Sequence, residues 1–325
     1  METATTAGVV ESNGPLKKYF DNTIKDYYNN TNTFEKAEIK MITETYEILK
    51  SKTKNKKFDI FIGGDLLNQL TSTNYAATKI NLPFLRIYSA CATSLEGIII
   101  AESLIKSGKV KNAVISATSH NTTAERQFRN PVEYGGPKHL TQTFTVTGSA
   151  LAYLSTKKSK IKIESTTIGT PIDSNIKDVS HMGAVMAIAA YDTIIKHLKN
   201  NNKKPNYYDL ILTDDLGKYS LAILKEMLGN DYKINDSACM IYNLEKQQVF
   251  AGRSGPACLP LVAYSFIFDE IKKGNLNKVL LVATGALMSP TTVNQKLNIP
   301  SIAHAVALER VWYIFIHFFL LDLYL

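Results

Sequence analysis

The sequence predicts a layered α/β fold made of two duplicated halves. The main evidence is internal repetition: residues 58–66 (FDIFIGGDL) resemble residues 208–216 (YDLILTDDL) at an offset of 150. Further along, residues 90–119 resemble residues 256–285 at an offset of 166, and the two blocks keep the same order in both halves. Chance produces one such match more easily than two ordered ones, so the repetition indicates a duplicated fold. Short β-rich runs also alternate with helical patterns, which favours mixed sheets covered by helices.

Each half is expected to alternate strands with helices. The strands are short apolar runs without polar alternation, as in strands buried on both faces; they cover 58–63, 84–88, 113–117, 161–165, 210–213, 239–242 and 279–283. Apolar residues at helical spacing predict helices at 34–50, 93–107, 183–199, 217–228 and 257–273. Gly108 and Gly274 follow two of these patterns at matching positions and are expected to end the helices. No Pro- or Ser-rich linker separates the halves, so we expect them to pack into one body.

Both ends of the chain depart from the repeat. The second half opens with a clear strand pattern, whereas the first half has a weak or missing strand before its first helix. Residues 311–325 (VWYIFIHFFLLDLYL) are almost wholly apolar, but as a helix they would span about 22 Å, less than the roughly 30 Å of a bilayer core. An extra buried element, an out-of-register end of the coding sequence and a membrane-contacting tail all remain open. The predicted units are an N-terminal half at 1–156, a C-terminal half at 157–310 and an atypical apolar tail at 311–325.

The composition is that of a globular protein with a basic excess. A hydrophobic share of 45% and a charged share of 20% exclude a disordered, collagen-like or coiled-coil chain. The net charge is +8, but only five of the 37 basic residues are arginine, and abundant Lys, Asn, Ile and Tyr are typical of an AT-rich genome. The charge is therefore weak evidence for a nucleic-acid partner, and the lysine run at 50–57 is expected to be a solvated loop. A weak attraction to an anionic membrane surface remains open. Residues 1–12 are polar, so we expect no signal peptide.

Cys91 is the sharpest candidate for chemistry among the three cysteines. With Cys239 and Cys258 it makes an odd number, too few for a disulfide scaffold and consistent with a reducing compartment. Cys91 follows the predicted strand at 84–88 and precedes the helix expected from Thr93. A thiol there would face the positive end of the helix dipole, which favours the thiolate. Cysteine is also among the residues most often buried for packing alone, and that alternative stays open.

The segment around Cys91, SACATSLEG (89–97), resembles the nucleophile segment of the thiolase-like superfamily, which includes thiolases and ketoacyl synthases. A closer resemblance covers nearly the whole chain, from about residue 7 to Arg310. The segments that carry it are FIGGDLLNQ (61–69), TSHNTTAERQFRNPVEYGG (118–136), TVTGSA (145–150), QQVFAGRSGPAC (247–258) and VATGALMSPTT (282–292). They are similar to the stage V sporulation protein AD family. The resemblance implies a thiolase-like fold, in which two duplicated halves with mixed five-stranded sheets sandwich helices.

The same resemblance implies that the catalytic partners of Cys91 are altered. In thiolase-like enzymes the partners come from three loops of the second half, which fall here near Asp214 and Asp215, near Ser254, and near Ser301. A carboxylate in place of a neutral or cationic donor would repel a developing oxyanion and raise the pKa of the thiol. We therefore expect a relative that is non-catalytic or at most weakly acyl-accepting. The alternative is a thiolase-like acyltransferase with Cys91 as the acyl-accepting nucleophile.

The family resemblance also implies a ligand, partners and a location. The ligand is dipicolinic acid, a planar dianion that chelates Ca²⁺, and the chain would be the soluble component of the dipicolinate uptake complex of endospore formers. Such a ligand needs cationic or N–H donors at its carboxylates and a flat apolar slot for its ring. The candidate ligand-binding residues are Cys91, His120, Arg126, Arg129, Ser254 and His304.

The remaining expectations follow from the same source. No resident cofactor or protein metal site is predicted, because two neighbouring acidic residues are too few for a Ca²⁺ site. The implied partners are integral membrane subunits of the uptake complex, at the inner membrane of the developing spore. A homodimer through the strand near the nucleophile is also expected.

Overall fold

Two sheets of matching topology organise the molecule in the computed structural model, which describes residues 1–128 and 140–311. The first sheet has the order β2-β1-β7-β5-β3-β4. Its strands are β1 (Glu2–Ala7), β2 (Asn22–Thr23), β3 (Phe61–Gly64), β4 (Phe84–Arg86), β5 (Asn112–Ser119) and β7 (Gly148–Ser155). The second has the order β11-β10-β13-β14-β8, with β9 beside β14. Its strands are β8 (Ile161–Thr167), β9 (Ile172–Asp173), β10 (Leu210–Thr213), β11 (Ile234–Asp236), β13 (Lys278–Ala286) and β14 (Pro300–Arg310).

The pairing confirms the duplicated α/β architecture. In the first half β7 runs antiparallel to both β1 and β5, and β3 lies parallel between β5 and β4. The second half repeats this arrangement with β14 between β8 and β13, and with β10 between β13 and β11. Each sheet therefore has the expected five-stranded core, to which the two-residue strands β2 and β9 add a short sixth member.

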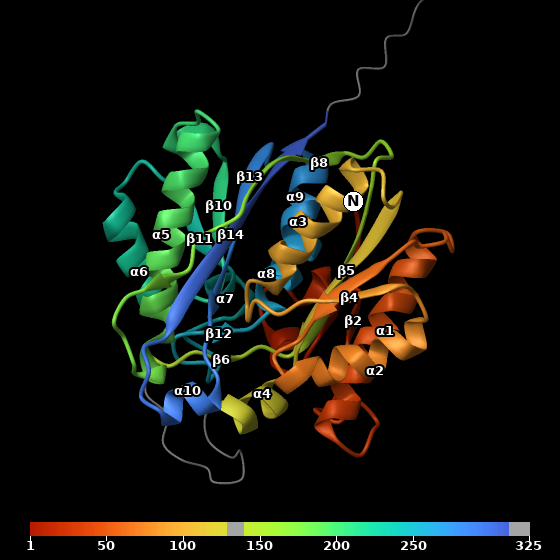
Figure 1. The fold of residues 1–325 in the computed structure, drawn as a ribbon, viewed down its shortest axis with the longest axis horizontal. Helices are drawn as coiled ribbons and strands as arrows, with labels where there is room; N and C mark the ends of the chain where they lie inside the picture. Colours follow the sequence, from red (N-terminus) through yellow and green to blue (C-terminus); the bar gives the residue numbers. More distant parts are fainter. Residues whose placement is uncertain (129–139, 312–325) are drawn as a thin grey trace, which may run out of the picture.

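Helices form the layers around and between the two sheets (Figure 1). The middle layer contains α3 (Thr93–Lys106) and a continuous segment of α8 (Cys258–Val262), a π-helical turn (Ala263–Ile267) and α9 (Phe268–Lys273). The outer layers are α1 (Phe34–Lys52) and α2 (Thr71–Ile80) on the first sheet, and α5 (Met182–Asn200) and α6 (Gly217–Leu228) on the second. The middle helices carry the largest apolar core, which includes Leu95, Ile98 and Phe268.

Repeated residues perform repeated structural tasks. Asp59 Oδ2 accepts the backbone N–H of Lys111 at 2.7 Å and closes the turn before β5. Asp209 Oδ2 accepts the N–H groups of Asn277 at 2.7 Å and Lys278 at 3.0 Å in front of β13. Each carboxylate thus ties one parallel strand to its neighbour at the same point of the two halves.

Three sequence expectations need correction. The first strand is present as β1, and its residues pair with β7 from Glu2↔Tyr153 to Ala7↔Gly148. Its core contacts come from threonine rather than from large apolar side chains, which is why the sequence signal was weak: Thr6 Oγ1 bonds Thr45 and Thr3 Oγ1 donates to Tyr264 O.

The second correction concerns residues 239–242, which were expected to form a strand. They lie largely in α7 (Ser237–Ile241), because the side chain of Asp236 accepts the Ala238 N–H and starts a helix directly after β11. Third, β4 is not buried on both faces: it lies at the sheet edge, and Leu85 is 42% exposed.

The apolar tail lies almost entirely outside the described residues, which end at Val311. Within the described ranges, no helix is both long and apolar enough to cross a membrane.

Candidate functional site

Cys91 lies in a tight turn between β4 and the start of α3. Ala90 has a φ of +49°, an unusual conformation for a residue with a Cβ. The side chain of Thr93 holds the turn, since its Oγ1 donates to Ala90 O at 2.7 Å and accepts the Ser89 N–H at 3.2 Å. At Gly285 a Cβ would come within 2.4 Å of Ser89 O, so glycine allows β13 to pack directly against the turn. The backbone on both sides of Cys91 is thus fixed by contacts from the two halves.

A small, mostly apolar cavity of about 40 Å³ adjoins Cys91. The described residues that line it are Leu66, Tyr88, Ala90, Cys91, Phe128, Thr145, Met182, Met186, Ser254, Ala286 and Met288. They come from both halves, which places Cys91 and Ser254 at the junction of the duplicated units. The volume is too small for an acyl chain or an aromatic acid without movement of the lining side chains.

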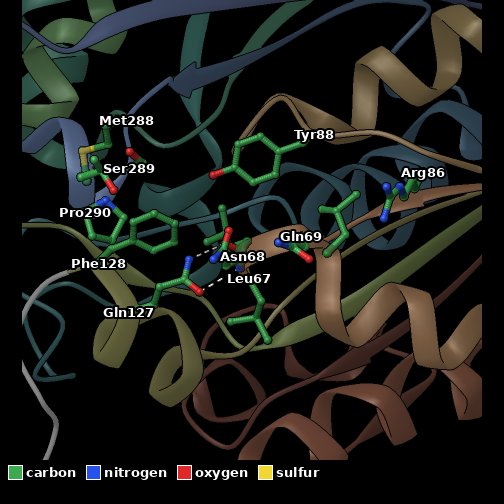
Figure 2. Close-up of a pocket in the computed structure, with 13 residues that line it drawn as sticks. Leu67, Asn68, Gln69, Arg86, Tyr88, Gln127, Phe128, Met288, Ser289 and Pro290 are labelled. Carbon is green, nitrogen blue, oxygen red and sulfur yellow. Dashed lines mark hydrogen bonds between the residues drawn. The ribbon is translucent and has the colours of Figure 1, made fainter.

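A larger cavity of about 650 Å³ lies next to the small one, and we call it the vestibule (Figure 2). Four residues line both cavities and separate them: Leu66, Tyr88, Phe128 and Met288. Gln127 secures one side of the vestibule, because its side chain donates to Leu66 O at 3.1 Å and accepts the Asn68 N–H at 2.8 Å. Arg86 is the only cationic side chain among the described residues that line either cavity.

The Tyr88 side chain lies at the boundary between the cavities. Although 43% of the residue is exposed, desolvation of its phenol, and then the charges of Cys91 and Asp65, raise its pKa from 10.0 to about 12, so the hydroxyl is neutral and able to donate a hydrogen bond. Together with Arg86 and the ring of Phe128, it gives the vestibule a cation, a neutral donor and two aromatic surfaces.

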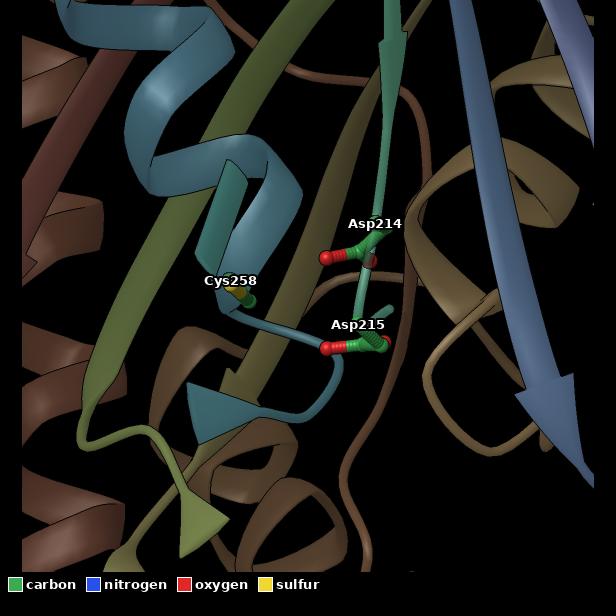
Figure 3. A group of neighbouring side chains, drawn as sticks. All are labelled: Asp214, Asp215 and Cys258. Atoms are coloured by element: carbon green, nitrogen blue, oxygen red, sulfur yellow. The ribbon is translucent and has the colours of Figure 1, made fainter. Parts of the chain in front are cut away.

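Asp214, Asp215 and Cys258 form a fully buried acidic cluster (Figure 3). Their ligand-type atoms all lie within 4.8 Å of one another. Asp215 has a φ of +69°, and its Oδ1 accepts the Gly255 N–H at 2.6 Å. The Cys91 side chain also interacts with this carboxyl group and lowers its pKa, against the larger effect of burial. The cluster therefore occupies the place beside the thiol where a catalytic partner is needed.

The electrostatics of the cluster favour protonated groups. Burial first, and then the charges of Asp215 and Asp236, raise the pKa of Asp214 well above 3.8. Burial also raises the pKa of Asp215 well above 3.8 and that of the Cys258 thiol well above 9.0. Two carboxylates and a thiolate at these positions could hold a metal ion, but the ligands would first have to lose their protons. In the absence of a metal, the pair carries at least one proton.

Two predicted site histidines have structural partners elsewhere. His120 is buried; its Nε2 bonds Tyr27 O at 2.8 Å and its Nδ1 accepts the Thr122 N–H at 3.2 Å. His304 accepts the Gly169 N–H at Nδ1 at 3.1 Å. Burial lowers the pKa of both rings to about 4, so both are neutral at physiological pH. Neither is among the described residues that line the vestibule or the cavity at Cys91.

The remaining predicted residues have different positions. Arg126 pairs with Glu35, and Ser301 Oγ donates to Val185 O at 3.0 Å. Ser254 lines the Cys91 cavity, as stated above, and its Oγ lies 3.4 Å from Phe144 O. Arg129 lies outside the described residues. The structure thus brings Cys91, Asp214, Asp215 and Ser254 together, and does not bring Arg126, His120 or His304 to the cavity lining.

The sequence interpretation missed the residues that shape the cavities. Arg86 and Tyr88 directly precede the nucleophile segment, so the end of the strand before Cys91 carried a usable signal. Phe128 ends α4 (Asn121–Phe128) and Met288 lies in the loop after β13, so only the fold shows that they line the same cavities.

Sequence comparisons find relatives over nearly the whole chain. The sequence pattern of the family described as Stage V sporulation protein AD (SpoVAD) matches residues 1–309. The chain is 44% identical over 313 residues to Stage V sporulation protein AD of Bacillus subtilis (strain 168), covering 94% of this chain and 92% of that protein.

Solved structures show the same thiolase-like fold at low sequence identity. The 3-oxoacyl-[acyl-carrier-protein] synthase III of Aquifex aeolicus VF5 aligns with a TM-score of 0.62 at 16% identity, covering 95% of this chain and 98% of that one. The corresponding synthase of Pseudomonas aeruginosa PAO1 gives 0.59 at 12% identity, covering 96% and 97%. OleA of Xanthomonas campestris gives 0.57 at 13% identity, covering 83% and 80%. These similarities establish the fold and say nothing about the reaction.

Proposed function

Because the chain belongs to the stage V sporulation protein AD family, we propose that it binds dipicolinate, free or as its Ca²⁺ chelate, during endospore formation. The binding site in this proposal is the former catalytic cleft, that is, the vestibule together with the small cavity at Cys91. One observation carries the proposal. Cys91 has acidic neighbours in place of the usual catalytic partners, and next to it lies a vestibule with groups suited to a planar anion.

The vestibule has the groups that an aromatic dianion requires. Its volume of about 650 Å³ lies within the range of small-molecule sites. The Arg86 guanidinium is able to bind a carboxylate, and the neutral Tyr88 hydroxyl is able to donate to one. Phe128 and Met288 supply apolar surface for the ring. Movement of these two side chains would extend the site toward Cys91 and Ser254.

The acidic cluster supports a binding role over thioester chemistry. A condensing enzyme needs neutral or cationic donors at the developing oxyanion, and whichever member of the Asp214–Asp215 pair is ionised can only accept hydrogen bonds and would repel that charge. An ionised carboxylate beside Cys91 disfavours the thiolate, which is the reactive form of cysteine. In this proposal the cleft is a degenerate thiolase site.

A second candidate function is acyl transfer with Cys91 as the acyl-accepting nucleophile. The observation in its favour is the position of Cys91 directly before α3, a helix whose N-terminal dipole stabilises a thiolate. A protonated acidic pair would weaken this activity less than an ionised one, so the two candidates require a direct comparison.

The proposed setting is the inner membrane of the developing spore, with integral membrane subunits of the uptake complex as partners. A homodimer through the exposed edge of β4 is part of the same proposal, since that strand borders the Cys91 turn.

Titration calorimetry with dipicolinate, with and without Ca²⁺, tests the binding proposal. We expect saturable heat from the unmodified chain and an affinity loss of about 10- to 100-fold in Arg86→Gln, the cost of one charge-assisted contact. Arg126→Gln is the matched control, because Arg126 pairs with Glu35 away from the cavity lining, and it is expected to bind normally. Equal losses in the two variants, or no heat from the unmodified chain, would contradict the proposed site.

Mass spectrometry after incubation with an acyl-CoA separates the second candidate from the first. The binding role predicts no adduct on Cys91, whereas acyl transfer predicts an adduct that turns over and is absent from Cys91→Ser. An adduct without any dipicolinate heat would favour the enzyme.

A further inference from the structure

Three loops at one end of the first half carry a group of exposed lysines, which we call the lysine patch. The loops connect α1 to β3, α3 to β5 and β7 to β8. The patch consists of Lys54, Lys56, Lys57, Lys109, Lys111, Lys157, Lys158 and Lys160, all of them exposed.

The three loops are neighbours in space. The backbone N–H of Lys111 donates to Asp59 Oδ2 at 2.7 Å, which joins the loop before β5 to the loop before β3. Asn112 pairs with Ser155 across β5 and β7, so the loop that follows Ser155 starts beside the loop that ends at Asn112. In Figure 1 these connections lie toward the upper right, away from α4 (Asn121–Phe128) and α10 (Pro290–Asn294).

The charge of the patch is not neutralised by described residues. None of the eight lysines forms an ion pair within the described part of the chain, whereas the bordering Lys52 and Lys106 pair with Asp21 and Glu102. The only acidic residue in the three loops is Asp59, and its Oδ2 is already engaged by backbone N–H groups. The patch thus concentrates eight positive charges in a chain whose net charge is +8.

The duplicated half provides an internal comparison. Lys203 and Lys278 occupy the corresponding end of the second half, and there both pair with Glu164, while Lys278 also pairs with Glu309. Two lysines at this end of the second half are thus paired with carboxylates, whereas no described residue forms an ion pair with any lysine of the patch. The accumulation in the first half is a property of this sequence and does not follow from the fold.

We propose that the lysine patch binds the surface of an anionic lipid bilayer. Lysines at loop tips attract anionic headgroups without a shaped pocket, each contributing about 1 kcal/mol, or roughly fivefold in affinity. Nucleic-acid sites commonly add arginine and aromatic stacking surfaces. The patch contains no arginine, and the rings beside it, those of Phe58 and Tyr153, are only 3% and 6% exposed.

The patch also sets the orientation of the bound protein. Its loops precede β3 and β5, at the amino ends of the parallel strands, whereas Cys91 follows β4 at their carboxyl ends. A bilayer on the patch therefore leaves the vestibule facing away from the lipid surface. This inference is independent of the proposed ligand, since it uses none of the residues that line the vestibule.

Vesicle co-sedimentation of the full chain tests the proposal. We expect binding to vesicles that contain phosphatidylglycerol, no binding to pure phosphatidylcholine, and release as the salt concentration rises. The triple variant Lys57→Glu, Lys111→Glu, Lys158→Glu is expected to lose roughly 100-fold in affinity for the anionic vesicles. The matched control, Lys177→Glu, Lys246→Glu, Lys296→Glu, changes the net charge equally on exposed lysines that follow β9, α7 and α10, away from the patch, and is expected to lose less than about threefold.

Each other outcome overturns the proposal. Equal losses of vesicle affinity in the two triple variants would show that binding depends on the net charge and not on the patch. Absence of binding to anionic vesicles would show that the patch is not a membrane-binding surface. Patch-dependent binding of a duplex RNA with no vesicle binding would replace the bilayer by a nucleic acid. Thermal unfolding of both variants verifies folding, and unchanged dipicolinate titrations separate this result from the fate of the proposed function.

Discussion

The carboxyl groups of Asp214 and Asp215 are fully buried, and no described lysine, arginine or histidine forms an ion pair with either one. Asp236, the third buried acid nearby, has ample partners, including Thr213 Oγ1 at 2.8 Å and the Gly217 N–H at 3.0 Å. Among the described residues, no hydroxyl or backbone N–H donates to either oxygen of Asp214, whose side-chain neighbours are Asp215 and Cys258. Asp214 is therefore the member of the cluster for which ionisation is most costly.

This cost predicts a pH-dependent stability gain in Asp214→Asn. In the unfolded chain the carboxyl titrates near 3.8, and burial raises the pKa of the folded form well above that value. Between the two pKa values the folded state binds more protons, so the stability of the unmodified chain falls as the pH rises from about 4. Asparagine does not ionise, so the variant is expected to match the unmodified chain at pH 4 and to exceed it at pH 8 by on the order of 1 kcal/mol.

Urea unfolding at both pH values measures the difference. Asp173→Asn serves as the control, because Asp173 is exposed and its neighbours lower the pKa of its carboxyl, so its substitution brings no gain at pH 8. A gain in Asp214→Asn that is equal at pH 4 and pH 8 would point to packing and contradict the electrostatic explanation.

At the scale of elements, β4 has one free edge among the described strands. It pairs with β3 from Phe61↔Phe84 to Gly63↔Arg86, and no described strand covers its other side. Leu85 is 42% exposed and Tyr88 is 43% exposed along the same segment. An apolar edge strand is a template for pairing with a second chain.

We therefore expect the chain to be a dimer in light scattering coupled to size-exclusion chromatography, and Leu85→Lys to shift it to the monomer by charging both copies of the edge. Leu297→Lys is the control, since Leu297 is 51% exposed in the loop between β13 and β14. A monomeric unmodified chain, or a dimer that survives Leu85→Lys, would remove β4 from consideration as the interface.

The element order could be read from the sequence because the duplication supplied it twice. Asp59 and Asp209 make equivalent hydrogen bonds in the two halves, so the repeated residues in the sequence indicated repeated elements in the fold. Strand β1 escaped detection because threonine hydroxyls, bonded to Thr45 and Tyr264, replace the apolar side chains that mark a strand. An apolar run of four at 239–242 does not distinguish a strand from a helical turn, and the cap by Asp236 decides for the helix.

The residues of the candidate site could be predicted from the sequence only where a reactive or charged side chain directly follows a strand. Cys91, Asp214 and Asp215 each come directly after a strand or its turn, and the packing of the two halves against each other brings them together. The wall between the cavities has no such local signal. Phe128, at the end of α4, and Met288, in the loop after β13, line the same cavities only because tertiary packing brings these distant segments together.

For the whole molecule, a buried polar network joins the two halves near the strands that carry the site. Glu11 of the first half is fully buried, and its Oε1 accepts the Tyr242 hydroxyl at 2.5 Å and the Thr147 N–H at 3.2 Å. The Arg253 guanidinium lies 3.5 Å from the same oxygen and donates to Thr145 O at 3.3 Å. Arg253 directly precedes Ser254, so the contact between halves and the lining of the Cys91 cavity share one short strand, β12 (Arg253–Ser254).

Removal of the cation alone is expected to destabilise the molecule strongly. Arg253→Met leaves the Glu11 carboxylate buried without its counter-charge, at a cost of about 3–5 kcal/mol in the free energy of unfolding. The double variant Glu11→Gln, Arg253→Met removes both charges, so it is expected to recover much of that loss. Lys40→Met, which breaks the partly exposed pair between Lys40 and Glu44, is expected to cost less than about 1 kcal/mol. Chemical unfolding of the three variants measures these free energies. If Arg253→Met loses no more free energy of unfolding than Lys40→Met, the buried pair does not stabilise the contact between the halves.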